Sequence, residues 1–162
     1  EMTNATDTIA EDDVLSIEFL RARRYESPLT IMMGDIDFFK NVNDEFGHLA
    51  GDAALRGVAS ILLHDLRNTD VAGRYGGEEI LVVLAQNEIS GAKVLAERWR
   101  SSVEEARFAD PAGQVLGVTL SIGVASLDAE MASPEALVGA ADAALYRAKS
   151  GGRNRVELAG PA

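Results

Sequence analysis

The sequence predicts an α+β domain in which helices pack against a central, mostly antiparallel sheet. Two observations support this fold class. Short apolar runs typical of buried strands alternate with longer segments whose apolar residues recur at helical intervals. Two of the strands are separated only by a paired-glycine turn, which makes them antiparallel neighbours. The 162 residues suit one domain, which we place at residues 13–160, after a polar segment or linker end at residues 1–12.

The first half of the chain is expected to hold three helices and one strand. Residues 12–25 have the apolar spacing of a helix. Residues 29–33 form a short apolar run, which we interpret as a buried strand ending at Asp35. Residues 38–47 predict a short helix stopped by its final glycine. Residues 51–67 repeat apolar side chains at the intervals of an amphipathic helix.

The second half is expected to hold a hairpin, two helices and further strands. Residues 71–84 predict two strands joined at Gly76-Gly77, where both glycines can adopt positive φ. Residues 90–107 are helical, and residues 114–127 fit one long strand or a second hairpin. A serine cap followed by proline begins a helix at residues 133–150. Residues 154–158 are a last strand.

The composition limits the possible partners. Asp and Glu number 26 against 15 Lys and Arg, which gives a net charge of -11. Such a surface repels duplex nucleic acid, so we expect no nucleic acid partner. The sequence has no cysteine, no signal peptide at its start and no apolar run near the ~20 residues of a membrane helix. The lack of cysteine fits a reducing compartment, and the lack of a membrane-length apolar run predicts no direct membrane contact.

Two acidic stretches suggest a metal site. In "GDIDFFK" (residues 34–40) Asp35 ends the predicted strand, and in "RYGGEEI" (residues 74–80) Glu78 begins a strand. If these strands are neighbours, both carboxylates lie at one edge of the sheet. Magnesium takes one or two carboxylates and fills its other positions with water and phosphate oxygens. The two glycines of the turn lack side chains, so a ligand can approach the backbone there.

Each stretch also has a purely structural interpretation. Asp37 is suitably placed to cap a helix beginning at Phe38, as Asp often does. Glu78 and Glu79 alternate across a strand, so one of them could face water. Taken singly, each stretch fits either interpretation.

Together the motifs resemble the GGDEF domain of diguanylate cyclases, which join two GTP molecules into cyclic di-GMP and release two pyrophosphates. The signature is "GGEEI" at residues 76–80, and the resemblance covers about residues 14–158. Three further blocks come in the family's order, at residues 35–52, 121–125 and 141–156. The resemblance implies a ferredoxin-like βαββαβ core, as in nucleotide cyclase and polymerase palm domains.

The sequence departs from the family's pattern in two places. Ile80 stands where the signature usually has Phe, which exchanges one apolar residue for another. The "LTxLxNR" type of motif that normally precedes the first helix cannot be recognised in residues 1–12. In relatives that segment borders the guanine pocket, so the departure bears on guanine affinity and turnover.

The resemblance implies a catalytic metal centre. Asp35 and Glu78, with the backbone carbonyl of Ile36, would hold Mg²⁺ or Mn²⁺, two ions per half-site. Glu79 would lie near the metals and the attacking 3'-hydroxyl, and its role as general base is a hypothesis. Two ions of this kind stabilise the attacking and leaving oxygens of a phosphoryl displacement.

The resemblance also implies a substrate site. Asn43 and Asp52 match guanine-reading positions, and their amide and carboxylate can bond the guanine edge. Lys40, Lys149 and Arg153 match phosphate-contacting positions. Taken singly, Asn43 fits a helix end or turn, Asp52 fits a helix N-cap, and each of these three cations fits a solvated surface charge. The residues placed against the substrate are Asn43, Asp52, Lys40, Lys149, Arg153, Gly76 and Gly77.

A second site is suggested by the "RxxD" pattern of Arg67 and Asp70, which precedes the signature at the family's offset. In related proteins this pattern binds cyclic di-GMP away from the active site and inhibits the enzyme. The planar fork of Arg67 suits a phosphate or a guanine edge. Arg98 matches the position of a second arginine of that site.

The resemblance predicts an active diguanylate cyclase that works as a homodimer, because one domain holds one GTP and the product needs two. An attached sensory domain is also usual in such enzymes. Because the implied substrate is GTP, the resemblance also implies a cytoplasmic location. The alternative is a catalytically weak domain that serves as a receptor for GTP or cyclic di-GMP. A third interpretation, an acidic interaction domain, predicts no nucleotide binding.

Overall fold

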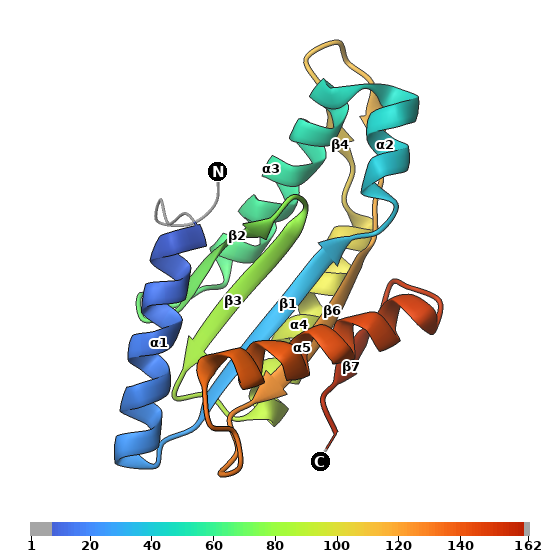
Figure 1. The fold of residues 1–162 in the computed structure, drawn as a ribbon. Coiled ribbons are helices and arrows are strands. Elements are labelled where there is room, and N and C mark those ends of the chain that lie inside the picture. Colours follow the sequence, from blue (N-terminus) through green and yellow to red (C-terminus); the bar gives the residue numbers. More distant parts are fainter. Residues whose placement is uncertain (1–7, 161–162) are drawn as a thin grey trace.

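The computed structural model describes residues 8–160 and has a five-stranded sheet at its centre. The strands lie in the order β2-β3-β1-β6-β7, and each pair is antiparallel except β6 and β7. The α+β class with a mostly antiparallel sheet is therefore confirmed (Figure 1). The five strands are β1 (Leu29–Ile36), β2 (Val71–Gly76), β3 (Glu79–Ala85), β6 (Leu120–Ser126) and β7 (Val156–Leu158).

Five helices and a small second sheet complete the described residues. The second sheet pairs β4 (Phe108–Ala109) with β5 (Val115–Leu116). Strands β1, β2, β3 and β6, with the helices between them, follow the predicted βαββαβ order. The helices are α1 (Thr8–Tyr25), α2 (Phe39–Phe46), α3 (His48–His64), α4 (Ile89–Glu105) and α5 (Pro134–Ser150).

Helices cover both faces of the sheet, which explains why all eight residues of β1 are buried. Ile31 and Met33 of β1 pack in a core with residues of α1 and α5. Met32, on the opposite face, packs in a second core with residues of α3 and α4, including Trp99. Figure 1 shows α5 crossing one face of the sheet while α3 and α4 lie on the other.

The hairpin turn differs from the prediction. Gly77 and Glu78 form the turn, whereas Gly76 is the last residue of β2 and pairs with Glu79. Only Gly77 of the two glycines has a positive φ, at 51°. Glu78 therefore lies in the turn itself, and the prediction that it begins the strand was wrong. A register shift between Arg74 and Gly76 accounts for this displacement, which sequence spacing does not reveal.

Three other helix or strand boundaries differ from the prediction. Helix α3 begins at His48, three residues before the predicted start, and ends at His64. Residues 114–127 form neither one strand nor a hairpin, because β5 pairs with β4 and β6 joins the main sheet. Helix α1 begins at Thr8, so it includes part of the segment that we set apart as residues 1–12, while residues 1–7 lie outside the described chain.

Helix α5 lies in direct backbone contact with β6 at Gly123. A Cβ at this position would stand 2.3 Å from both the carbonyl oxygen of Ala141 and the amide nitrogen of Leu145. Only a residue without a side chain permits that approach. The close packing fixes the height of α5 above the sheet, and with it the position of the charged residues that α5 carries. Within residues 8–160, none of the helices is long and apolar enough to cross a membrane.

Candidate active site

The two acidic stretches lie side by side in the sheet. Asp35 of β1 and Glu79 of β3 are direct cross-strand partners, and Ser121 of β6 is the partner of Asp35 on its other side. Directly opposed residues project from the same face of a sheet. This is the face covered by α1 and α5, because Asp35 follows Ile31 and Met33 in the alternation of β1. Glu78 lies in the adjoining turn.

Asp35 is a buried carboxylate with one open oxygen. The residue is 4% exposed, and the Lys149 ammonium of α5 donates a hydrogen bond to its Oδ2. Its Oδ1 is buried and has no hydrogen-bond partner among the described residues. Burial raises the pKa of Asp35 despite the opposing effect of Lys149, and the nearby charges of Glu78 and Asp37 raise it further. An unpaired buried carboxylate oxygen is costly, so this geometry favours an arriving cation.

These residues fit a metal ion that brings part of its own ligand shell. Among the described residues no three acidic, histidine or cysteine side chains are grouped so that they could hold an ion by themselves. Magnesium does not need such a cage, because one or two carboxylates and the phosphates of a substrate complete its octahedron. The candidate oxygen donors are Asp35 Oδ1, the Glu78 carboxylate, whose charge acts on Asp35, and the carbonyl of Ile36, the last residue of β1.

Glu79 has an environment suited to a proton acceptor. Burial raises its pKa, and the negative charges of Asp142 and Asp35 raise it further, while Lys149 opposes them. Sequence reasoning assigned no role to Asp142. The available signal was its spacing, since Asp142 precedes Lys149 by two helical turns and so shares its face of α5. Asp142 also lines a cavity of about 310 Å³ with residues of α1 and β2, including Tyr75.

The two guanine-reading candidates lie at the corner between α2 and α3. The side-chain oxygen of Asn43 rests on Gly51, where a Cβ would come within 1.8 Å of it. Asp52 is the next residue of α3 and is exposed. Asp52 lies within the helix, whose N-cap is Gly47, so the interpretation of Asp52 as an N-cap was wrong. The corner therefore brings an amide and a carboxylate close together at the surface.

The three candidate phosphate contacts differ in their surroundings. The Lys149 ammonium is bound to Asp35, as described above. The Arg153 guanidinium lies over the ring of Phe38, 4.6 Å from its centroid. Lys40 instead forms an ion pair with Asp44 of its own helix, with 3.6 Å between the charged atoms, and its side chain is 90% exposed. Lys149 and Arg153 thus lie at the C-terminal end of α5, beside the end of β1.

Arg67 and Asp70 of the RxxD pattern form a doubly hydrogen-bonded pair. Asp70 is 3% exposed and accepts hydrogen bonds from Nε and Nη2 of Arg67, both at 3.2 Å. Arg67 also donates to the carbonyl of Ala85 at 3.0 Å. Arg98 of α4 pairs with Asp65 at 3.5 Å, at the other end of the segment between α3 and β2. The two arginine side chains are 55% and 58% exposed, so both can reach a ligand.

A comparison with known families decides what this arrangement is. The sequence model of the family described as "Diguanylate cyclase, GGDEF domain" matches residues 2–155. The chain belongs to the GGDEF family. The resemblance seen in the sequence is thereby confirmed.

Curated relatives of this GGDEF domain include named cyclases. It is 50% identical over 130 residues to Diguanylate cyclase A of Treponema denticola, which covers 80% of this chain and 35% of the relative. It is 42% identical over 137 residues to Response regulator PleD of Caulobacter vibrioides, which covers 84% of this chain and 30% of the relative. The chain thus spans about a third of the length of these relatives.

Solved structures share the fold closely. The GGDEF domain of DgcB from Caulobacter crescentus, solved in complex with c-di-GMP, superimposes with a TM-score of 0.93 at 33% identity, over 99% of this chain and 92% of that one. The active GGEEF domain of a diguanylate cyclase from Vibrio cholerae gives a TM-score of 0.84 at 34% identity, over 91% and 93% of the two chains.

Proposed function

We propose that this GGDEF domain condenses two GTP molecules into cyclic di-GMP and releases two pyrophosphates. The observation that carries the proposal is the buried Oδ1 of Asp35, which has no hydrogen-bond partner among the described residues, beside the cross-strand partner Glu79. Relatives that bear the name diguanylate cyclase support the same activity. We infer Mg²⁺ or Mn²⁺ as the metal, with two ions in each half-site.

Each acidic residue has a distinct role in this proposal. Asp35, Glu78 and the carbonyl of Ile36 hold the metal ions. Bound magnesium neutralises phosphate charge and stabilises the attacking and leaving oxygens. Glu79 accepts the proton of the 3'-hydroxyl as that oxygen bonds to the α-phosphorus of the facing GTP. The bond from that phosphorus to the pyrophosphate oxygen then breaks.

The cations and the α2–α3 corner bind the substrate. Lys149, which donates to Oδ2 of Asp35, would also be able to donate to the triphosphate, where Arg153 would join it. Lys40, long and exposed, can swing from Asp44 to a phosphate oxygen. Asn43 and Asp52 read guanine: the carboxylate accepts from its N–H groups, and the amide both donates and accepts.

The catalytic unit is a symmetric dimer, because one domain presents a single half-site. Two domains facing each other across a two-fold axis place each 3'-hydroxyl against the α-phosphate of the other GTP. Product formation is therefore expected to rise with more than the first power of protein concentration when dimers are scarce.

A product assay tests the proposed activity. The domain is incubated with GTP and Mg²⁺ at several protein concentrations, and cyclic di-GMP is separated and quantified. We expect a product that requires the metal. If nucleotide binds but no product forms even at high protein concentration, the domain is a receptor for GTP or cyclic di-GMP and the cyclase proposal is wrong.

The acidic limb of the pH profile of kcat/KM tests Glu79 as the base. Asp142→Asn is expected to move that limb to lower pH. Removing the Asp142 charge lowers the pKa of Glu79, so more of Glu79 is ionised and able to accept a proton in acidic solution. Glu79→Gln should remove most of the activity. The control is Glu135→Gln, which removes an acid of the same helix that does not act on Glu79. If the acidic limb of Asp142→Asn lies at the same pH as that of the unchanged protein, Glu79 is not the base.

We further infer that Arg67, Asp70 and Arg98 form a site at which cyclic di-GMP inhibits the enzyme. The Arg67 guanidinium is fixed by the buried Asp70 and the carbonyl of Ala85, while its side chain stays 55% exposed. Such a planar donor set matches a phosphate or a guanine edge. Arg98 lies on the neighbouring helix α4, within reach of the same segment through Asp65. Titration with cyclic di-GMP under conditions without GTP tests for binding here.

Arg98→Ala is expected to weaken inhibition by cyclic di-GMP roughly 10–100-fold, the loss of one charge-assisted hydrogen bond. The initial rate and the melting temperature should stay unchanged, because Asp65 keeps its bond from Trp99. Arg67→Ala should weaken inhibition too but also destabilise the fold, since it deprives the buried Asp70 of its fork. Lys93→Ala, an exposed cation of the same helix, is the control. If cyclic di-GMP inhibits Arg98→Ala as strongly as the unchanged protein, it does not bind at this site.

A further inference from the structure

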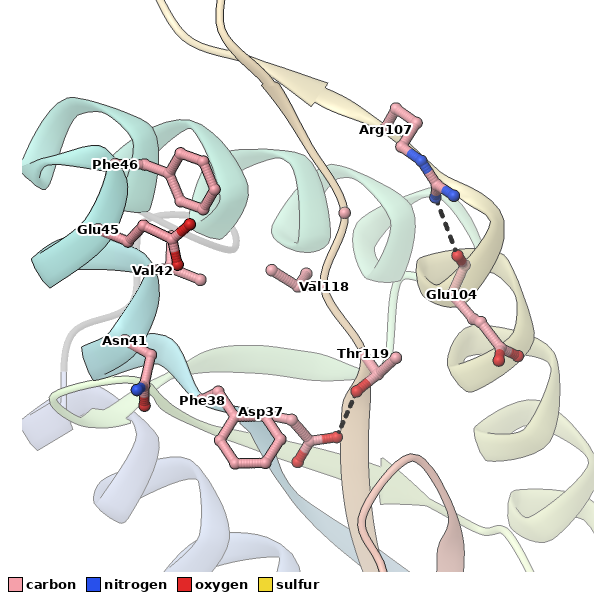
Figure 2. Close-up of a pocket in the computed structure, with 11 residues that line it drawn as sticks. Asp37, Phe38, Asn41, Val42, Glu45, Phe46, Glu104, Arg107, Val118 and Thr119 are labelled. Atoms are coloured by element: carbon pink, nitrogen blue, oxygen red, sulfur yellow. Dashed lines mark hydrogen bonds between the residues drawn. The ribbon is translucent and has the colours of Figure 1, made fainter.

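Asp37 is a buried carboxylate with a function that its position in the sequence does not suggest. It lies one residue beyond β1 and is 3% exposed. The expectation that Asp37 caps the following helix was wrong, because Phe38 is the N-cap residue and no side chain caps α2. The Asp37 side chain turns instead toward β6, where Figure 2 shows its bond from Thr119.

Three donors from distant parts of the chain meet at this carboxylate. The hydroxyls of Thr119 and Ser121 donate to it, each at 2.7 Å. The backbone N–H of Asn154 donates to Oδ2 at 3.0 Å. A carboxylate offers about four acceptor positions, so three neutral donors occupy most of them. Asp37 therefore joins the end of β1, the start of β6 and the segment after α5.

The segment that Asp37 holds is conformationally unfavourable. Arg153 and Asn154 both adopt positive φ, at 67° and 48°, in a region that side chains other than glycine rarely occupy. Such a backbone persists only when surrounding bonds determine it. The Asn154 side chain adds two more bonds, accepting from Arg100 at 2.8 Å and donating to Glu104 at 2.9 Å.

The same segment places the guanidinium of Arg153. That group lies on the ring of Phe38, itself in a left-handed conformation at φ 58°, and stands 4.0 Å from Asp37 Oδ1. At this separation the two groups form a long ion pair, and the Asp37 oxygens are already engaged by three neutral donors. Arg153 is thus oriented without having its charge fully compensated.

The two aspartates at the end of β1 hold two different cationic residues. They are two residues apart, so their side chains leave the same side of the chain. Asp35 contacts Lys149, and Asp37 holds the turn that carries Arg153. Lys149 in the last turn of α5 and Arg153 just beyond that helix are therefore both held by aspartates at the end of β1.

We propose that Asp37 is a positioning residue that orients Arg153 toward the triphosphate by fixing the Arg153–Asn154 turn. The inference rests on the proposed function, since it takes the substrate to be GTP. Asp37 touches neither the substrate nor a metal in this account. Its positioning effect passes through Arg153. Its charge also raises the pKa of Asp35, an effect that Asp37→Asn removes just as Asp37→Ala does.

The test is binding of a non-hydrolysable GTP analogue in Mg²⁺ buffer, measured by calorimetry for single and double variants. Asp37→Ala removes the acceptor of the Asn154 N–H and should weaken binding roughly 10–100-fold, the effect of losing one charged contact to phosphate. Arg153→Ala should weaken it equally. The double variant should be no weaker than Arg153→Ala alone, because residues that act as one unit are not additive.

Asp37→Asn is the rescue variant. Its carbonyl can still accept from Asn154, and its amide can donate to a hydroxyl of Ser121 or Thr119, which accepts as readily as it donates. Affinity for the analogue should return close to that of the unchanged protein. If Asp37→Ala does not fold, Asp37→Ser replaces it, because a shorter hydroxyl stays polar beside Thr119 and Ser121 but withdraws from Asn154.

The outcomes distinguish failure of the proposed function from failure of the positioning role of Asp37. Absence of analogue binding by the unchanged protein overturns the proposed function. Binding by the unchanged protein with equal affinity in Asp37→Ala or Asp37→Ser overturns the positioning role. Additive losses in the double variant overturn it as well, since they would show that Asp37 acts on the site by a route other than Arg153. Melting temperatures measured in parallel verify that each variant is folded.

Discussion

Asp35→Asn is expected to lower the rate of cyclic di-GMP synthesis by roughly a thousand-fold or more. The amide cannot supply the anionic ligand that the metal requires, and metal catalysis contributes several kcal/mol of transition-state stabilisation, each ~1.4 kcal/mol being worth tenfold. The rate is measured as product formed from GTP at saturating Mg²⁺. Glu105→Gln, which removes an exposed carboxylate of α4, is the matched control and should keep full activity.

The same variant should not destabilise the metal-free domain at neutral pH. Burial raises the pKa of Asp35 in the folded state, so the ionised form costs stability above that pKa. A neutral amide removes this cost. The metal-free unchanged protein should accordingly gain stability from this group as the pH falls through the raised pKa toward the unfolded value. Full activity of Asp35→Asn, or a large drop in its melting temperature, would contradict our description of the site.

Gly123→Ala should have the largest effect on stability. A methyl group there would meet backbone atoms of α5 at 2.3 Å, and backbone cannot turn aside as a side chain can. Overpacking of this kind costs about 3 kcal/mol, which corresponds to a fall in melting temperature of roughly 6–12 °C for a domain of this size. Thermal unfolding followed by circular dichroism measures it. Activity should fall as well, because α5 carries Lys149 and Asp142.

Gly139→Ala is the control for this substitution. Gly139 belongs to the same helix, and a Cβ there would meet nothing within 4 Å. Alanine in a helix interior is more favourable than glycine by roughly 0.5–1 kcal/mol, so this variant should melt at the same or a slightly higher temperature. Equal melting temperatures for Gly123→Ala and Gly139→Ala would show that α5 does not depend on the close contact with β6.

Local patterns predicted the elements well where one physical cause dominated. The apolar run of β1 is continuous because both faces of that strand are covered, and its end at the acidic residues followed from the change in polarity. The cap at Ser133 was likewise visible, and its hydroxyl accepts from Ala136 at 3.3 Å. The motif blocks by themselves indicated the GGDEF family.

The errors occurred where distant parts of the chain decide the outcome. Asp37 has a sound local explanation as a helix cap, but its actual partners lie 82 to 117 residues away. The glycine turn shifted by one residue because of an irregularity in the pairing of β2 with β3. The charge of Asp142 matters only because α5 packs on β6 and β1 and so brings Asp142 near Glu79, an arrangement that periodicity does not specify.

The measurement that most directly tests the central claim is calorimetric titration of the domain with a non-hydrolysable GTP analogue, with Mg²⁺ and again with a chelator. Our account predicts binding that depends on the metal in the unchanged protein and is lost in Asp35→Asn. Equal affinity with and without divalent ions, or equal affinity in both proteins, would show that the acids of β1 and the hairpin turn do not hold a metal against the nucleotide.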